Sequence, residues 1–298
     1  MRDINGLKLG VVHAQLYPQV MGGEGPVVET AGVIAAEAAV KVIEVSHVRD
    51  ELTRARLRQL IQSGGLKVIF NAESMILRQK WDLGAESPAA LEEAFTGLRG
   101  LMDEAAFLGA GLFVVMSGPD TAPEGRAAAR ARLAESLKRL CDEGGKLGLA
   151  VSLESFDRDV DKKCLIGPVA EAVEVAKAVK KDNFGLSLDL SHILLLKESP
   201  GESVSQAKNF LLHAQISNCV LAEGSPSRGD LHPTFGTEGS LASVDQAAEF
   251  MRSLDKSGFF KKPNGGYVSL EVRPREEEYS SVVLSGALRF LSNTIEKL

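Results

Sequence analysis

The sequence is poor in cysteine, and the cysteines it has are not arranged for bridging. Cys141, Cys164 and Cys219 are far apart, and no two of them form a C-x-x-C motif. An odd number of distant cysteines gives no disulfide framework that uses all of them. A fold held together by disulfides and a structural zinc site built from thiolates are therefore excluded.

Positive charge is also in short supply. The 34 lysines and arginines are outnumbered by 40 acidic residues, which gives a net charge of -6. This balance argues against a general affinity for nucleic acid or for anionic membranes. No apolar run approaches the roughly 18–20 residues that cross a bilayer. The N-terminus does not resemble a signal peptide, so we expect a cytoplasmic protein.

The phosphate-binding loops of nucleotide enzymes are missing too. The segment after the first apolar run reads H-A-Q-L-Y-P-Q-V-M-G-G-E-G, which lacks G-x-G-x-x-G spacing, and there is no G-x-x-x-x-G-K. An open, doubly wound sheet would carry such a loop at this place. No Pro/Ser-rich linker divides the chain. These absences favour one closed domain.

What the chain does contain is a regular alternation of short Val/Ile/Leu-rich runs with longer helical patterns. Such alternation indicates βα units around a parallel sheet. The expected strands are 7–13, 41–46, 66–71, 111–117, 148–154, 184–189, 211–216 and 267–271. The expected helices are 28–38, 51–63, 88–109, 124–146, 168–181, 203–209, 241–257 and 279–297. Eight units in one chain predict an α/β fold, a single-domain (β/α)₈ TIM barrel over residues 1–298.

Two helix ends carry recognisable signals. Ser87-Pro88 places a capping residue before a proline in the first turn, which predicts the start of the third helix. Gly144-Gly145 follows the leucine stripe of the 124–146 segment, where a glycine would end the helix.

The two ends of the expected strands differ in character. Lysines precede or begin three of them, at Lys8, Lys41 and Lys67. The carboxyl ends, where barrel enzymes place functional groups, instead carry or adjoin His13, Glu44, His47, Asn71, Ser117, Glu154, Asp189, His213 and Glu271. This asymmetry supports the register and argues against a Schiff-base aldolase, which needs a lysine inside the barrel near the top.

Four of these residues come from the last four strands. Glu154, Asp189 and Glu271 end their strands, and His213 lies near the start of L-L-H-A-Q-I. A barrel brings these strands side by side, so the sequence predicts one divalent metal ion bound by all four residues. Three carboxylates and one imidazole suit Mn²⁺, Co²⁺ or Mg²⁺, or Zn²⁺ in a catalytic rather than a structural site.

The ordered set Glu, Asp-x-x-His, His, Glu at the ends of strands five to eight resembles the xylose isomerase-like TIM-barrel superfamily. The sugar phosphate isomerase/epimerase and tagatose 3-epimerase branch is the most similar. The resemblance covers nearly the whole chain and implies the same four metal ligands, with His192 contacting the substrate. It also implies a downstream segment rich in Gly and Pro, which G-D-L-H-P-T-F-G-T-E-G at 229–239 resembles. Members of this branch are often dimers or tetramers, so we expect a homo-oligomer.

Two positions depart from the branch. An acid six residues after the first Glu and an arginine six after the metal His are replaced by Val160 and Cys219. Asp157 or Asp159 could substitute for the acid and Arg273 for the arginine. The resemblance therefore implies the fold and the metal more strongly than the particular reaction.

The activity expected is that of a metal-dependent sugar isomerase or epimerase in carbohydrate metabolism, with manganese a suitable ion. Glu154 and Glu271 would move a proton at the carbon next to a ketose carbonyl through an enediolate. Its partner would be a small sugar or sugar derivative, with no nucleic acid or membrane. The residues expected to contact this substrate are His192, Arg273, His232 and His13.

Other readings stay open. A metal-dependent lyase or dehydratase acting on a keto-sugar or keto-acid would use the same groups. The pair Asp189-x-x-His192 and Asp230-x-His232 is similar to endonuclease-IV-type phosphodiesterases, and a barrel that only binds a sugar is the non-enzymatic alternative. Glu44 and His47 could pair with each other, Trp81 and Phe235 could wall a sugar pocket, and Arg228 lies in a loop that either holds a phosphate or is plain surface.

Overall fold

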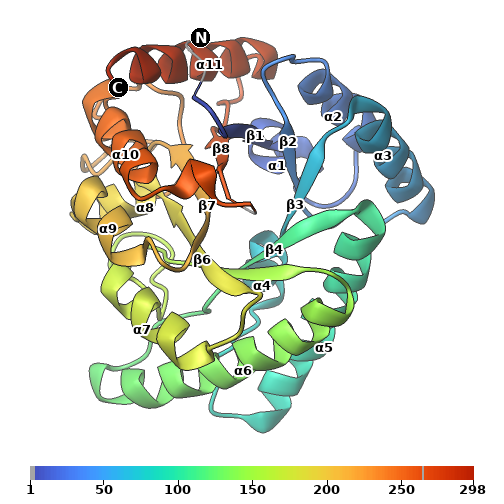
Figure 1. The fold of residues 1–298 in the computed structure, drawn as a ribbon, viewed down its shortest axis with the longest axis vertical. Coiled ribbons are helices and arrows are strands. Elements are labelled where there is room, and N and C mark those ends of the chain that lie inside the picture. The colour runs from blue at the N-terminus through green and yellow to red at the C-terminus, as the bar shows by residue number, and fades with distance from the viewer. Residues whose placement is uncertain (1–3, 264) are drawn as a thin grey trace.

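The protein is described by a computed structural model that covers residues 4–263 and 265–298. The first three residues, on which part of the signal-peptide expectation rests, lie outside the described residues. Eight parallel strands pair in sequence order, and the last pairs with the first to close a barrel. Figure 1 shows this closure, with β1 and β8 side by side inside the ring of helices. The expected TIM-barrel fold is confirmed.

All eight expected strands are present within two residues of the expected bounds, and β1 ends one residue early. They are β1 (Lys8–Val12), β2 (Val42–Val45), β3 (Lys67–Asn71), β4 (Ala110–Met116), β5 (Ala150–Glu154), β6 (Phe184–Asp189), β7 (Leu211–Ser217) and β8 (Tyr267–Glu271). The helix that begins at His13 is what shortens β1.

The helices pack around the outside of the barrel. The long ones are α2 (Val27–Ala35), α3 (Glu51–Gly64), α5 (Pro88–Leu108), α6 (Arg126–Lys146), α7 (Val169–Val179), α9 (Pro200–Ala207), α10 (Val244–Lys256) and α11 (Ser280–Glu296). Short ones that the sequence pattern does not predict are α1 (His13–Leu16), α4 (Glu73–Gln79) and α8 (Leu190–Leu195), with 3₁₀ turns at Pro18–Val20, Pro123–Gly125 and Phe259–Lys261. Among the described helices, none combines the length and apolarity needed to cross a membrane.

Helix α6 ends at Lys146, as expected for the 124–146 segment, but the predicted glycine cap is wrong. The helix runs through Gly144-Gly145, and Leu147 is its C-cap. Gly144 serves packing instead, since a Cβ there would lie 3.2 Å from the Leu149 carbonyl oxygen and 3.4 Å from Val151. The predicted start at Ser87 is confirmed, because its side chain accepts a hydrogen bond from the Ala90 amide at 3.4 Å.

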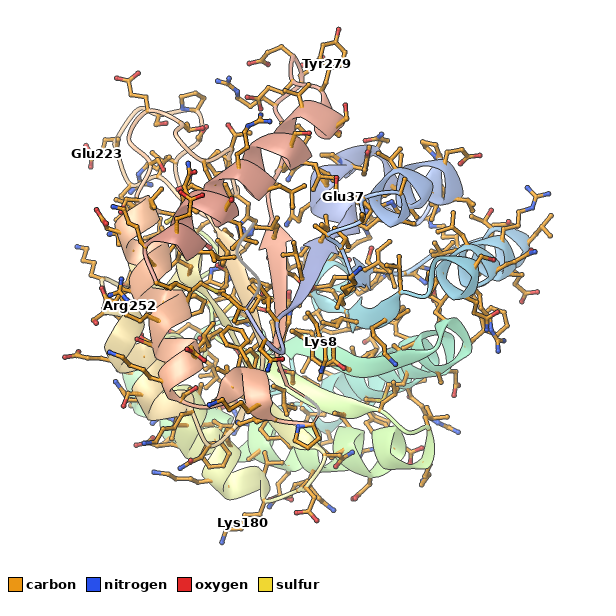
Figure 2. The ribbon with its side chains drawn as sticks, turned by 45° about the horizontal axis from the view of Figure 1, so that its top comes forward. Lys8, Glu37, Lys180, Glu223, Arg252 and Tyr279 are labelled. Atoms are coloured by element: carbon orange, nitrogen blue, oxygen red, sulfur yellow. The ribbon has the colours of Figure 1, made fainter. Side chains whose placement is uncertain are left out.

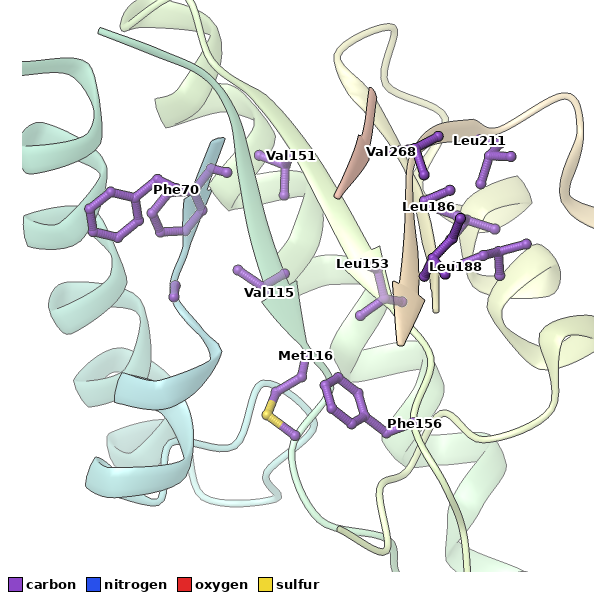
Figure 3. Packing of buried hydrophobic residues seen from close by; sticks show 14 of the residues in the cluster. Phe70, Val115, Met116, Val151, Leu153, Phe156, Leu186, Leu188, Leu211 and Val268 are labelled. Carbon is purple, nitrogen blue, oxygen red and sulfur yellow. The ribbon is translucent and has the colours of Figure 1, made fainter. Parts of the chain in front are cut away.

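The main hydrophobic core lies between the strands and the helices. Figure 3 shows strand residues of this layer, including Val151, Leu153 and Leu188. The Phe70 and Phe113 rings on neighbouring strands stack with centroids 5.5 Å apart. Burial of such side chains is the main source of stability in a barrel of this kind.

The inside of the barrel is filled in two chemically different layers. A small apolar cluster near the amino ends of the strands is made by Val42, Ile69, Leu112 and Val114. Above it the interior is polar, and the Ser152 and Ser187 hydroxyls lie 2.6 Å apart. This layer forms the floor of the functional site.

Candidate metal centre

A cavity of about 210 Å³ opens at the carboxyl ends of the strands. Functional groups of (β/α)₈ enzymes collect at this end because the βα loops surround it. The polar and charged residues that line the cavity are Gln15, Glu44, Ser46, Asn71, Glu73, Ser74, Glu154, Lys162, His192, Asp230, His232, Glu271 and Arg273.

The three carboxylates expected to share a metal lie beside one another. Glu154, Asp189 and Glu271 each end a strand, and all three are buried. Two groups of side chains have potential ligand atoms within 4.8 Å of one another: Glu154 with Asp189 and His192, and Asp189 with His232 and Glu271. Asp189 belongs to both groups and so joins them into one acidic centre.

Local structure aims these carboxylates into the centre. One oxygen of Asp189 accepts a 2.6 Å hydrogen bond from the Ser191 amide at the start of α8, and a second bond from the Ser217 hydroxyl. Its other oxygen, Oδ2, is buried without a hydrogen-bond partner among the described residues, as is Oε2 of Glu154. A buried ionised oxygen without a partner is costly. A cation is the partner that suits both.

Burial raises the pKa of Glu154 well above its ordinary value, and the carboxylates of Glu73 and Asp189 raise it further. Burial likewise raises the pKa of Glu271, with Asp189 and Glu44 adding to the effect. So many acids in one buried space cannot all be ionised unless a positive charge joins them. The donor set therefore fits a divalent ion.

His213, the expected nitrogen ligand, is not brought to this centre. Its neighbour across the sheet is Tyr267 at the beginning of β8, whereas Ser217 lies opposite Glu271. Its Nε2 lies 3.2 Å from the Ser269 hydroxyl and 3.3 Å from Oε2 of Glu44. Burial lowers the pKa of His213 to about 3, so the imidazole is neutral. The residue belongs to the polar floor below the site.

Gln215 holds the position expected for His213. It lies opposite Asp189 in the pairing of β6 with β7 and is fully buried. Its Nε2 donates to Oε1 of Glu44 at 3.2 Å, which leaves its amide oxygen without a partner among the described residues. An amide oxygen is a ligand for hard divalent ions. The register shift between Leu186 and Ser187, which moves β7 against β6, is invisible in the sequence pattern.

A further acidic pair, Glu44 and Glu73, lies on the opposite wall. Asn71 at the end of β3 donates to Oε1 of Glu44 at 3.1 Å and to Oε2 of Glu73 at 2.9 Å. Burial raises the pKa of Glu44 to about 7 and that of Glu73 to about 8. Glu73 is a cavity residue that the sequence interpretation missed; the clue was its place two residues after a strand end, in the first turn of α4.

Two histidines are held over the centre by one aspartate. Asp230 Oδ1 lies 3.4 Å from Nδ1 of His192 and 3.3 Å from Nε2 of His232. The same histidines reach the strand-end glutamates, His192 at 3.2 Å from Glu154 and His232 at 3.5 Å from Glu271. Both therefore lie where the sequence interpretation expects substrate contacts.

Asp230 remains ionised despite its burial. Burial alone would raise its pKa, but His192, His232 and Lys162 hold the pKa of this carboxyl below its usual range. Lys162, from the loop after β5, places Nζ 3.1 Å from Oδ2 of Asp230. This ion pair ties the loop after β5 to the loop after β7.

His13 does not reach the cavity. Its Nε2 lies 2.8 Å from the Thr30 hydroxyl, its ring packs against Tyr17, and burial lowers its pKa to about 4. Gln15, two residues later, does reach the cavity, where its Nε2 donates a 3.0 Å hydrogen bond to Oε1 of Glu271. The short helix α1 turns His13 into the core and Gln15 toward the site.

Of the residues proposed to replace the missing acid and arginine, one reaches the cavity. Arg273 lines it. The Asp157 carboxylate instead accepts the backbone amides of Val160, Asp161 and Lys162 at 2.7 to 2.8 Å, so it is committed to shaping a turn. Asp159 lines a separate cavity.

Several other side chains belong elsewhere. His47 pairs with Glu104 at 2.6 Å rather than with Glu44. Trp81 packs against Gly97, where a Cβ would lie 2.0 Å from the indole, and Phe235 stacks on Phe290 with centroids 3.9 Å apart. Arg228 lines the same separate cavity as Asp159.

A closed parallel barrel with an acidic, histidine-containing centre at the carboxyl ends of its strands defines a class of α/β-barrel enzymes. The profile of the family described as xylose isomerase-like TIM barrel matches residues 33–285. The chain belongs to this family.

Similar solved structures include several sugar epimerases. One is a D-allulose 3-epimerase from Methylomonas sp., with 20% identity, full coverage of both chains and a TM-score of 0.75. Another is a 3-keto-D-glucoside 4-epimerase from E. coli, with 16% identity, 96% and 99% coverage of this and that chain, and a TM-score of 0.71. The IOLI protein with a bound zinc atom has 18% identity, 98% and 99% coverage and a TM-score of 0.76. Comparison with curated protein sequences found no match.

Proposed function

We propose that this protein is a divalent-metal-dependent isomerase or epimerase of keto-sugars. The observation that carries the proposal is the convergence of the buried carboxylates of Glu154, Asp189 and Glu271, two of which have an oxygen without a hydrogen-bond partner among the described residues. Sugar epimerases among the similar structures support the same reaction class.

Glu154, Asp189 and Glu271 would hold the ion, with the amide oxygen of Gln215 in place of the imidazole expected from His213. When bound, the ion supplies Lewis-acid polarisation of a substrate carbonyl. An all-oxygen set favours Mg²⁺ or Mn²⁺ over softer ions. The zinc of one similar structure shows that its own site accepts a borderline ion.

Glu154 and Glu271 are the proton-transfer residues in this proposal. One carboxylate removes the proton from the carbon next to the carbonyl, and the electron pair of that C–H bond moves onto the carbonyl oxygen. The other, as a carboxylic acid, returns a proton to the opposite face or to the adjacent carbon. A raised pKa suits a group that alternates between both forms near neutral pH, and burial raises both.

His192 and His232 complete the site. Each has a ring nitrogen within 3.5 Å of one of the two glutamates and another contact to Asp230. We therefore expect both imidazoles to lie beside the reacting carbon, where they would bind substrate hydroxyls and fix the sugar between Glu154 and Glu271.

The test is hydrogen exchange at carbon in D₂O. Protein loaded with Mn²⁺ is incubated with a panel of ketoses, and deuterium at the carbon next to the carbonyl is measured by NMR. We expect exchange, slowed about 10²–10⁴-fold in Glu154→Gln and in Glu271→Gln. Glu135→Gln, on the exposed face of α6, is the matched control and should retain the rate.

The same experiment separates the alternatives. Net loss of water from the substrate would identify a dehydratase that uses the same proton abstraction. No deuterium in any ketose, or full exchange in both glutamine variants, would refute the proposed acid–base pair.

A further inference from the structure

A second, larger cavity adjoins the central one. It has a volume of about 800 Å³. The loops after β1, β7 and β8 form its walls, with the residues Pro18, Gln19, Pro226, Ser227, Leu231, Pro233, Arg273, Pro274, Arg275, Glu276, Glu278, Tyr279 and Ser280. Figure 2 shows Tyr279 and Glu223, which belong to the loops after β8 and β7, projecting on the same side of the molecule. We call this the outer cavity.

The outer cavity borders the candidate metal centre. Leu231 and Arg273 line both cavities. Their relative position is fixed, because the Arg273 amide donates a 2.7 Å hydrogen bond to the carbonyl of His232, the residue that follows Leu231. A molecule held at the centre that extended past Leu231 and Arg273 would therefore enter the outer cavity.

The volumes of the two cavities indicate which part of a substrate each could hold. The central cavity, about 210 Å³, is smaller than the roughly 300–1,000 Å³ of pockets that enclose drug-sized ligands. It holds the reacting part of a sugar. The outer cavity is large enough for a second ring.

The walls of the outer cavity combine apolar residues with polar and charged ones. Four prolines contribute to it, at Pro18, Pro226, Pro233 and Pro274, and Tyr279 stands at its edge with 78% of its surface exposed. Proline fixes the backbone dihedral φ, so these surfaces are formed before a ligand binds. Rigid apolar surfaces of this kind suit the C–H face of a sugar ring or an aromatic ring.

The charges that line the outer cavity balance, since two arginines and two glutamates contribute to it. Arg275 and Glu278 neutralise each other through a 3.1 Å salt bridge, and Glu276 adds a negative charge. The Arg273 guanidinium has no hydrogen-bond or salt-bridge partner among the described residues, so its donors are available to a ligand. A neutral group with oxygen acceptors near the cavity boundary matches this arrangement.

We propose that the substrate is a glycoside of a keto-sugar rather than a free ketose. The keto-sugar ring occupies the central cavity, and its aglycone or second sugar ring lies in the outer cavity against the proline walls and Tyr279. Arg273 donates hydrogen bonds to the oxygen atoms at the linkage. This inference rests on the function proposed above and names the substrate class of that site.

The test compares one keto-hexose as its methyl glycoside and as its phenyl glycoside. Both carry the anomeric substituent, but only the phenyl ring can fill the outer cavity. Affinity for the Mn²⁺-loaded protein is measured by calorimetry, and proton exchange in D₂O is measured in parallel. We expect the phenyl glycoside to bind at least about tenfold more tightly, which is the gain expected from burying one ring against apolar walls.

Two variants locate the effect. Tyr279→Ala removes one wall, and Gln19→Trp narrows the outer cavity from its exposed rim; in each, the affinity ratio of phenyl to methyl glycoside should fall toward one. Leu52→Ala, which removes a 59% exposed leucine on α3, is the control and should leave the ratio unchanged.

The outcomes separate the two proposals. Equal affinity for the two glycosides, or a ratio unchanged in both outer-cavity variants, overturns the glycoside proposal even if free ketoses exchange deuterium. Tighter binding of the phenyl glycoside without exchange in any compound upholds the outer cavity and refutes the isomerase function instead.

Discussion

Gln215 and His213 lie two residues apart on β7 and differ completely in their surroundings. His213 contacts serines and Glu44 in the floor of the site, while Gln215 lies opposite Asp189 in the strand pairing and donates from its amide nitrogen to Glu44. Glu44 thereby orients the amide, because its Oε1 can only accept a hydrogen bond from the NH₂ group. Partners that orient a ligand in this way matter to a metal site nearly as much as the ligand itself.

We expect Gln215→Leu to weaken Mn²⁺ binding by about 10–100-fold, since leucine keeps the volume but removes the oxygen. Isothermal calorimetry with the metal alone measures this without relying on turnover. His213→Asn is the comparison, because it alters a neighbouring polar residue outside the centre, and its loss should be smaller. If His213→Asn lost as much Mn²⁺ affinity as Gln215→Leu, or more, His213 rather than Gln215 would be the metal ligand.

The acids of the site make the metal-free protein sensitive to pH. The pKa values of Glu44 and Glu73 are raised to about 7 and about 8 by burial, so the folded state retains protons that the unfolded state has released. Stability then falls as pH rises through these values. The neutral buried His13 and His213, with lowered pKa values, act in the opposite direction, but only below the unfolded histidine pKa of about 6.5.

The metal-free protein should therefore lose stability between about pH 6.5 and pH 8.5. Urea unfolding in the presence of a chelator across this range measures the trend. Glu73→Gln should make the fall less steep, because the amide cannot ionise; Glu135→Gln, on the exposed face of α6, should leave it unchanged. A flat profile in the unmodified protein would mean that these acids are not strained by burial.

At the scale of elements, the strands were readable from the sequence because each is a short Val/Ile/Leu-rich run between helical patterns. The short helices α1, α4 and α8 were not, because each is too brief to show a helical period and begins within two residues of a strand end. Their effect on the site is large. Helix α1 turns His13 away and Gln15 inward, and α8 supplies the Ser191 amide that orients Asp189.

The same limit applies to the candidate site. The three strand-end carboxylates could be predicted, because a charge at the end of a buried strand is visible in the sequence. Gln215 and Glu73 could not, since their placement depends on a shift in strand pairing and on a helix that follows its strand after one residue. Tertiary register decides which polar residue of a strand reaches the top of the barrel.

Gly10 in β1 leaves room for side chains of both neighbouring strands. A Cβ on Gly10 would lie 2.6 Å from the Ser269 hydroxyl of β8 and 3.2 Å from Cβ of Val42 in β2. We expect Gly10→Ala to destabilise the fold by about 1–3 kcal/mol through overpacking. Gly286→Ala, in α11 with no atom near the added methyl, is the control and should be stabilising by about 0.5–1 kcal/mol. Chemical denaturation measures the free energy of unfolding of both variants. If Gly10→Ala left it unchanged, Ser269 and Val42 would be able to shift away from the added methyl group without cost.

At the scale of the whole molecule, one end of the barrel carries a concentration of buried acids that a net charge of -6 alone does not reveal. The loops after β1, β7 and β8 extend this end into the outer cavity, while the ion pair of Lys162 with Asp230 joins the loops after β5 and β7. Metal binding should therefore stabilise the whole fold. It would remove repulsion between buried carboxylates that come from several strands around the barrel.

We expect a divalent ion to raise the melting temperature of the protein. At an Mn²⁺ concentration 100 times the dissociation constant, mass action contributes about 2.7 kcal/mol, which corresponds to several degrees for a domain of this size. Asp189→Asn should lose most of this shift, since Asp189 joins both groups of potential ligands. Asp142→Asn, at an exposed carboxylate on α6, should retain it. If chelator and Mn²⁺ gave the same melting temperature in the unmodified protein, the acidic centre would have to be stabilised by protons alone, and the metal-dependent mechanism would fail with it.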